Sequence, residues 1–308
     1  MNRKIKYSVS GIINAPRQIV WTVILSPALY KEVWQAKFSG DWKKNHKISF
    51  SGTWEGTSYK DKGTVLDIQD EKSLEYLYWS SFWNAPDIEE EYALIRYELQ
   101  SLDTFSCELV ITQTGFRDDI HYQETVNLWN DTIRKIKEIA EKEDLQNRVK
   151  FTLDNLTATM AKLTPLEYNR EREKKWTIGQ LVEHIRLGNS DFKRFLTEGA
   201  APITREYDVH IPQIRNMMND QSHRMEAPEF LIPPVIVYDV KEHLSALLTI
   251  KDELLVCTEL DLTQICTSLD IPPFGSLSFF EWLNFSIFHI ERHRQQIFLR
   301  VQDEHAGN

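Results

Sequence analysis

The chain changes its hydrophobic periodicity near its middle. From Ile5 to about Thr114, apolar and polar residues alternate in short runs such as HKISFSGTW and FSCELVITQTG, with Gly, Asp, Asn and Ser between them. This period of two is typical of strands, and the intervening turn residues indicate an antiparallel sheet. From Leu145 onward, apolar residues recur at spacings of three and four, as they do in helices. The pattern therefore predicts two domains, residues 1–144 and residues 145–308.

Two helical segments interrupt the alternation in the first half. One is a helix predicted to begin after Pro16, since proline is favoured in the first turn of a helix. The other runs from His121 to Glu143 and carries apolar residues at helical spacing, among them Trp129 and Ile133. Strands followed by a long helix form one curved layer packed on one helix. The first half is therefore predicted to be an α+β helix-grip domain, with an antiparallel sheet curled around a long C-terminal helix.

The second half reads as an all-α four-helix bundle. Thr177 with Gln180, and Ser278 with Glu281, have the spacing of capping boxes at helix starts. The segment from 198 to 234 is rich in Pro, Asn and charge, which is typical of a long connection between helices. Four helices joined by one long connection match a known bundle topology. The predicted helices cover residues 146–163, 177–196, 237–259 and 278–301.

Composition and charge narrow the functional classes. Hydrophobic residues make up 42% and charged residues 27%, as in soluble globular proteins. The net charge is −10, and each half, divided after residue 144, has 18 basic and 23 acidic residues. Neither half offers the basic surface that nucleic acids or anionic membranes require, so neither is expected as a partner. The three scattered cysteines form no CxxC pair, and no apolar stretch reaches about 18 residues, so a cytoplasmic protein is expected.

The residues of the first half resemble a known superfamily. The opening INAPRQIVW, the early Trp34, the GTVLDIQDEKSLEYLYW stretch and the ITQTGF strand before a Trp-bearing helix are similar to the START/Bet v 1-like (SRPBCC) fold, in its Hsp90-activator-like branch. The resemblance spans about residues 3–143. It implies an apolar cavity between sheet and helix, with a hydrophobic ligand. Seven of the nine tryptophans lie in this half and either line such a cavity or fill the core.

Candidate metal chemistry lies in the second half. His289 and His293 are four residues apart in an apolar helix, so their imidazoles lie on one face, one turn apart. Trp282 and Gln296 share this stripe as pocket residues. In the predicted 177–196 helix, His184 offers a third imidazole, and Asp191 is expected to orient it as a carboxylate behind the ligand. Spacing alone leaves metal ligation and core packing as open alternatives.

A second resemblance favours the metal. The W-T-x-G-x-L-x-x-H pattern from Trp176 to His184, and the E-W-x-x-F-x-x-x-H-x-x-x-H pattern from Glu281 to His293, are similar to the DinB/YfiT-like superfamily. The resemblance covers about residues 146–303. In that family, one histidine of the second helix and two of the last bind a divalent metal, zinc or nickel. It implies His184, His289 and His293 as ligands here.

Two reactions follow from such a site. A metal with three neutral ligands could promote hydrolysis of a small substrate, or hold a thiolate that attacks an electrophile. The resemblance to transferases of low-molecular-weight thiols implies the second, and Glu183, adjacent to His184, is expected to point away. No residue is assigned a catalytic role, and no organic cofactor is expected. The expected partner is a small molecule, and a homodimer stays open. The alternative is a non-enzymatic ligand-binding or stress-response sensor protein.

Overall fold

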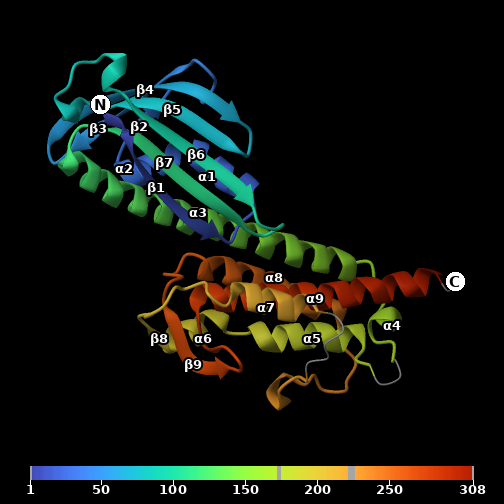
Figure 1. Ribbon diagram of the computed structural model, residues 1–308. Coiled ribbons are helices and arrows are strands. Elements are labelled where there is room, and N and C mark those ends of the chain that lie inside the picture. Colours follow the sequence, from blue (N-terminus) through green and yellow to red (C-terminus); the bar gives the residue numbers. More distant parts are fainter. Residues whose placement is uncertain (1, 172–174, 221–225, 307–308) are drawn as a thin grey trace. The chain divides into compact units, whose positions relative to one another are not determined.

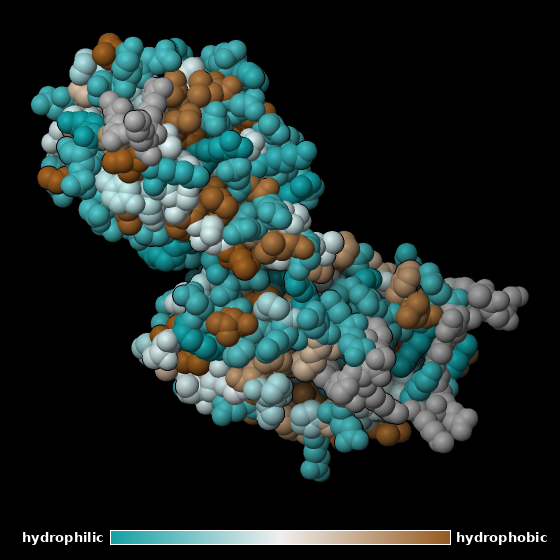
Figure 2. Space-filling view, viewed as in Figure 1, coloured by the Kyte–Doolittle hydropathy of each residue, from teal (hydrophilic) through white to brown (hydrophobic). Residues whose placement is uncertain are grey.

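The computed structural model describes residues 2–171, 175–220 and 226–306. The chain divides into two compact units, Met1–Asp144 and Leu145–Asn308. Each unit has its own hydrophobic core. The visible face of each unit in Figure 2 is largely hydrophilic, with smaller apolar patches between the polar residues.

The first unit is a seven-stranded antiparallel sheet in the order β1-β7-β6-β5-β4-β3-β2 (Figure 1). The first strand therefore pairs with the last, and the other strands follow as a meander. Along β7 every second residue is buried, which is the period of two seen in the sequence. The elements before the long helix are β1 (Asn2–Ile13), α1 (Arg17–Leu25), α2 (Pro27–Trp34), β2 (Lys37–Ser39), β3 (Lys47–Trp54), β4 (Thr57–Gln69), β5 (Ser73–Trp79), η1 (Ser81–Trp83), η2 (Glu89–Glu91), β6 (Ala93–Ser101) and β7 (Cys107–Phe116).

The long helix α3 (Asp119–Met160) closes this unit across one face of the sheet (Figure 1). The indole Nε1 of Trp129 donates a hydrogen bond to Gln113 Oε1 on β7 at 2.8 Å, which fixes the helix on the sheet. Trp34 lies between Phe50 and Trp129, with ring centroids 5.4 and 5.8 Å away. Aromatic side chains therefore fill much of the interior. The predicted α+β helix-grip architecture is confirmed.

The helices predicted over residues 121–143 and 146–163 are parts of one continuous helix, α3, which ends at Met160. The sequence EKEDLQNRVK where these two ranges meet contains no Gly or Pro, so nothing local ends the helix. What changes is the core that the helix contacts. Trp129 and Ile136 belong to the first core, whereas Val149 and Leu153 belong to the second.

The second unit is helical, as predicted. Its core joins the end of α3 to three further long helices through Leu156, Leu181, Leu254 and Ile287. Ser278 and Glu281 form the predicted capping box of the last helix, with hydrogen bonds of 2.8 and 3.0 Å. The helical elements after α3 are α4 (Pro165–Tyr168), α5 (Ile178–Asn189), α6 (Phe192–Glu198), α7 (Ile211–Asn219), η3 (Glu229–Leu231), α8 (Val240–Cys257) and α9 (Phe279–Ala306).

Two details of this unit differ from the prediction. The 177–196 helix is broken after Asn189, where Asp191 adopts a left-handed conformation with φ of 55°. The side chains of Asn189 and Ser190 bond to carbonyls one turn back, and such bonds compete with helix continuation. The sequence analysis also missed a small antiparallel sheet, formed by β8 (Ala200–Ala201), β9 (Ile265–Ile271) and β10 (Gly275–Ser278).

Candidate metal centre

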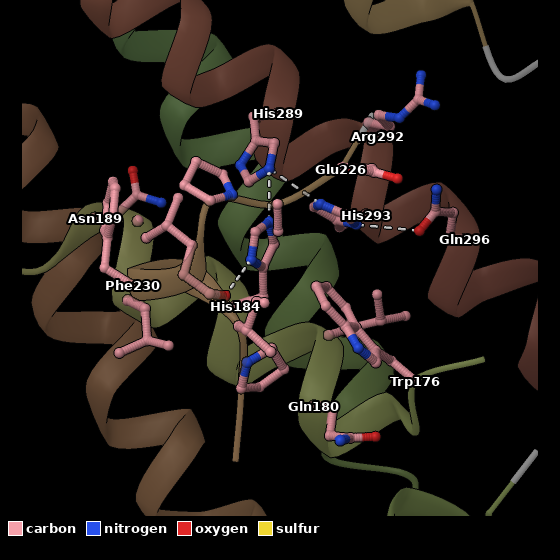
Figure 3. A pocket seen from close by; sticks show the side chains of 18 of the residues that line it. Trp176, Gln180, His184, Asn189, Glu226, Phe230, His289, Arg292, His293 and Gln296 are labelled. Atoms are coloured by element: carbon pink, nitrogen blue, oxygen red, sulfur yellow. Dashed lines mark hydrogen bonds between the residues drawn. The ribbon is translucent and has the colours of Figure 1, made fainter. Parts of the chain in front are cut away.

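Two helices present the three predicted histidines to one another. His184 lies on α5, which begins at a capping box between Thr177 and Gln180, with hydrogen bonds of 2.9 and 3.0 Å. His289 and His293 lie one turn apart on α9. Figure 3 shows the three imidazoles pointing toward one another inside the second unit.

The inner nitrogens of these imidazoles converge. The Nε2 atom of His289 is 3.1 Å from that of His184 and 3.0 Å from that of His293. The candidate ligand atoms of the three residues all lie within 4.8 Å of one another. Around a tetrahedral zinc ion with bonds of about 2.0–2.1 Å, ligand nitrogens are about 3.4 Å apart. The two separations that involve His289 are close to that value.

The outer nitrogens of two imidazoles are fixed by hydrogen-bond acceptors. His184 Nδ1 donates to the backbone oxygen of Leu231 at 2.8 Å, and His293 Nδ1 donates to Gln296 Oε1 at 3.1 Å. A carbonyl oxygen only accepts, so the proton of each neutral ring is on Nδ1. The inner Nε2 atoms of His184 and His293 therefore carry lone pairs. One N–H on His289 could satisfy only one of them, whereas a cation between the rings would satisfy both.

Burial keeps this cluster neutral. It lowers the pKa of His289 well below the usual value, and the neighbouring His293 and His184 lower it further. Burial and the nearby His184 likewise lower the pKa of His293 to about 3. The pKa of His184 is lowered by burial, although the bond to Leu231 acts in the opposite direction. Neutral imidazole is the form that binds a metal, so the three side chains fit a divalent zinc or nickel ion.

The remaining predicted site residues fall in different places. Gln296 contacts His293 directly, as described above. Trp282 is buried, lines the same cavity and packs edge-on against Phe195 at 4.8 Å. Asp191 does not orient His184. Its side chain is 75% exposed and lies 3.9 Å from Arg194, because the break after α5 turns it outward. The backbone oxygen of Leu231 takes the place predicted for its carboxylate.

Glu183 points away from the cluster, as the helical geometry predicts. Its carboxylate binds Arg186 with two contacts of 2.7 Å and accepts from His243 Nε2 at 3.1 Å. The other nitrogen of His243, Nδ1, pairs with the hydroxyl of Tyr168 at 2.6 Å. This buried network joins α4, α5 and α8. Glu183 therefore has a structural role, on a side of α5 that faces away from the histidine cluster.

The histidine cluster opens into a cavity of about 2140 Å³. Its walls come from α5, α9, the β9–β10 turn and the segment from 226 to 237. The sequence analysis missed two residues of this wall, Glu226 and Phe230 (Figure 3). The run FLIPPVIV at 230–237 was the available signal, because so apolar a stretch is unusual in a polar connection.

Comparisons with known proteins place each unit in a family. Residues 14–141 match the family described as activator of Hsp90 ATPase homolog 1-like protein, and residues 148–297 match the DinB superfamily. The chain therefore joins an Hsp90-activator-like domain of the SRPBCC fold to a DinB-superfamily domain. No helix of the described residues is long and apolar enough to cross a membrane. A comparison with curated proteins returned no match.

Several solved structures are similar to part of the chain. A protein from Cytophaga hutchinsonii is 28% identical, with 46% of this chain and 98% of that chain covered and a TM-score of 0.41. An HSP90 activator from Plasmodium falciparum is 14% identical over 41% and 87% of the two chains, with a TM-score of 0.34. The Zhui aromatase/cyclase from a Streptomyces species is 14% identical over 45% and 94%, with a TM-score of 0.36.

Proposed function

We propose that the DinB-superfamily unit binds one divalent metal ion, zinc or nickel, through Nε2 of His184, His289 and His293. The observation that carries this proposal is the convergence of the Nε2 atoms of three neutral imidazole rings. In two of these rings, those of His184 and His293, the proton is held on the outer nitrogen, Nδ1. A cluster kept only for packing has no need of two inward lone pairs. The proposed ion offers them a shared partner.

We further propose that the chain is a metal-dependent enzyme. When bound, such an ion lowers the pKa of water or a thiol and polarises an electrophile, since three neutral ligands leave its charge undiminished. The chain's own residues hold the imidazoles in place. The indole of Trp176 packs 5.1 Å from the ring of His184, and the ring of Phe285 stacks 6.4 Å from His289.

Thiol transfer is the reaction we favour. A thiol that loses its proton more readily needs no protein base to become a nucleophile. Glu183 is unsuited to be such a base because Arg186 and His243 occupy its carboxylate. Hydrolysis is the second candidate, and the observation that favours it is Glu226, a carboxylate in the cavity wall that could accept a proton from water.

The role of the first unit is a separate proposal. Its Hsp90-activator-like fold favours binding of a hydrophobic ligand. The chain could on that basis be a ligand-binding or sensor protein without catalysis. A cytoplasmic location also stays a proposal, consistent with three buried free cysteines.

Two measurements test the proposed function. Elemental analysis of the full chain after loading with zinc or nickel should give about one ion per chain, and His289→Ala should lose it. His210→Ala, which changes a histidine outside the cluster, is the matched control. The loaded protein is then incubated with chlorodinitrobenzene and a panel of small thiols, beside esters and amides. Conjugation of a thiol to chlorodinitrobenzene that is abolished in His184→Ala would support thiol transfer. Absence of metal from the loaded wild-type protein would contradict the proposed metal site.

A further inference from the structure

The cavity beside the histidine cluster has an unusually apolar wall. We call residues 226–237 the cavity strap. Within it, Phe230 is 69%, Val235 88% and Val237 83% exposed, although large apolar side chains are normally buried. Ile232 and Ile236 of the strap are exposed as well. Contiguous apolar exposure on a folded unit commonly marks a binding surface.

The strap is held in place by its backbone, so the exposure is part of the folded structure. The Leu231 oxygen accepts the hydrogen bond from His184 Nδ1. Beyond the strap, Asn169 exchanges two hydrogen bonds with the backbone of Tyr238, at 2.8 and 3.0 Å. The Tyr238 hydroxyl in turn donates to the Pro234 oxygen at 2.5 Å. The cavity strap therefore positions His184, a proposed metal ligand, and also presents apolar side chains to the cavity.

The opposite wall is also apolar. Leu187 of α5 and Trp282, Phe285 and Leu299 of α9 line the cavity with the strap. Among the described residues that line the cavity, positive and negative charges are equal in number. The cations are Lys175, Arg292 and Arg300, and the carboxylates are Glu171, Glu226 and Asp270. Arg292 and Arg300 donate to backbone oxygens of the protein at 2.6–2.9 Å. The walls therefore favour an uncharged, apolar body over a polyanion.

The size of the cavity points the same way. Pockets for drug-sized ligands have volumes of about 300–1,000 Å³. The cavity here, at about 2140 Å³, is larger than that range. A small polar thiol or ester would fill little of it and leave apolar walls against water.

We infer that the substrate of this site is an amphiphile, with a head group that can bind a metal and a long apolar body that lies between the strap and α9. The inference rests on the proposed function for the position of the head group. The apolar body is carried independently by the strap and the facing helices. A medium or long alkyl or acyl chain has the required chemistry.

Straight-chain alkyl hydroxamates of two to ten carbons test this inference, because the head binds zinc and only the tail changes. Calorimetry on the full chain, zinc-loaded and metal-free, measures their dissociation constants. For the loaded protein, affinity should rise up to about fourfold per buried methylene. The metal-free protein should keep this rise from an overall weaker baseline. Affinity that does not increase with tail length would overturn the inference.

Variants of exposed strap residues locate the tail. Phe230→Ser and Val235→Ser should weaken the decyl probe about tenfold and leave the ethyl probe unchanged. Leu166→Ser is the matched control, since Leu166 is 73% exposed in the same unit but lies outside the cavity. Equal tail dependence in the strap variants would place the tail elsewhere, for example in the first unit, and overturn the inference. Equal affinities with and without zinc would instead contradict the proposed metal site, while the inferred binding of the apolar body between the strap and α9 would stand.

Discussion

The Nε2 atoms of His184 and His289 lie 3.1 Å apart although 105 residues separate them in the sequence. Helices α5 and α9 must both be in place before the two nitrogens meet. The proposed metal would therefore bind the folded second unit and not the unfolded chain. Such a ligand stabilises the fold in proportion to its affinity.

Zinc should raise the melting temperature of the second unit. At a free concentration about 100 times the dissociation constant, the stabilisation is about 2.7 kcal/mol, or about 5–10 °C for a unit of this size. Calorimetric melting with and without zinc measures the shift. His289→Ala and His293→Ala should lose it, whereas His210→Ala should keep it. An equal shift in all four proteins would mean that zinc binds elsewhere.

Gln296 should act as a positioning residue for His293. Gln296→Leu removes the acceptor of the Nδ1 proton, and loss of such a partner typically weakens metal binding about 10- to 100-fold. Gln296→Glu keeps an acceptor oxygen and should retain most of the affinity. Asp191→Asn should have no effect, because this side chain is exposed. Zinc titration against a competing chelator measures all three, and an unchanged affinity for Gln296→Leu would refute the role.

Glu226→Gln separates the two candidate reactions. If the enzyme hydrolyses its substrate with Glu226 as the base, the variant should lose about 10²- to 10⁴-fold in hydrolysis rate. Thiol conjugation should be nearly unchanged, because the thiol needs no base from the protein. Zinc content is the control and should stay at one ion per chain. Equal hydrolysis by the wild type and the variant would remove Glu226 from the mechanism.

His121 should make the first unit sensitive to acid. Burial and then the Arg117 charge lower its pKa, while Asp118 opposes them, and its Nδ1 accepts the backbone N–H of Arg117 at 3.3 Å. Below about pH 6.5 the unfolded chain takes up a proton that the folded chain resists. The free energy of unfolding therefore decreases as the pH is lowered below that value. Urea unfolding followed by tryptophan fluorescence at pH 7 and pH 5 measures this loss. His121→Gln should reduce it, and an undiminished loss would contradict the assignment.

The sequence predicted those parts of the fold that periodicity controls. Alternation in β7 and helical spacing in α9 gave the two architectures, and the pair His289 and His293 followed from spacing on one helix. His184 was a candidate from its apolar helix, but only the family resemblance joined it to that pair, since no local pattern connects residues 105 positions apart.

The parts that failed depend on contacts that a sequence does not display. The partner of His184 is the backbone oxygen of Leu231, and any residue type at that position would supply the same atom. Asp191 was misplaced because the side chains of Asn189 and Ser190 end the helix at Asn189, two residues before it. The sequence divided α3 into two ranges because a helix can change the core it contacts without changing its backbone.

Anomalous diffraction from crystals of the full chain loaded with zinc would test the central claim most directly. The account predicts one strong peak in the second unit, about 2.0–2.1 Å from Nε2 of His184, His289 and His293. A peak on other residues, or three well-ordered imidazoles with no peak between them, would contradict it.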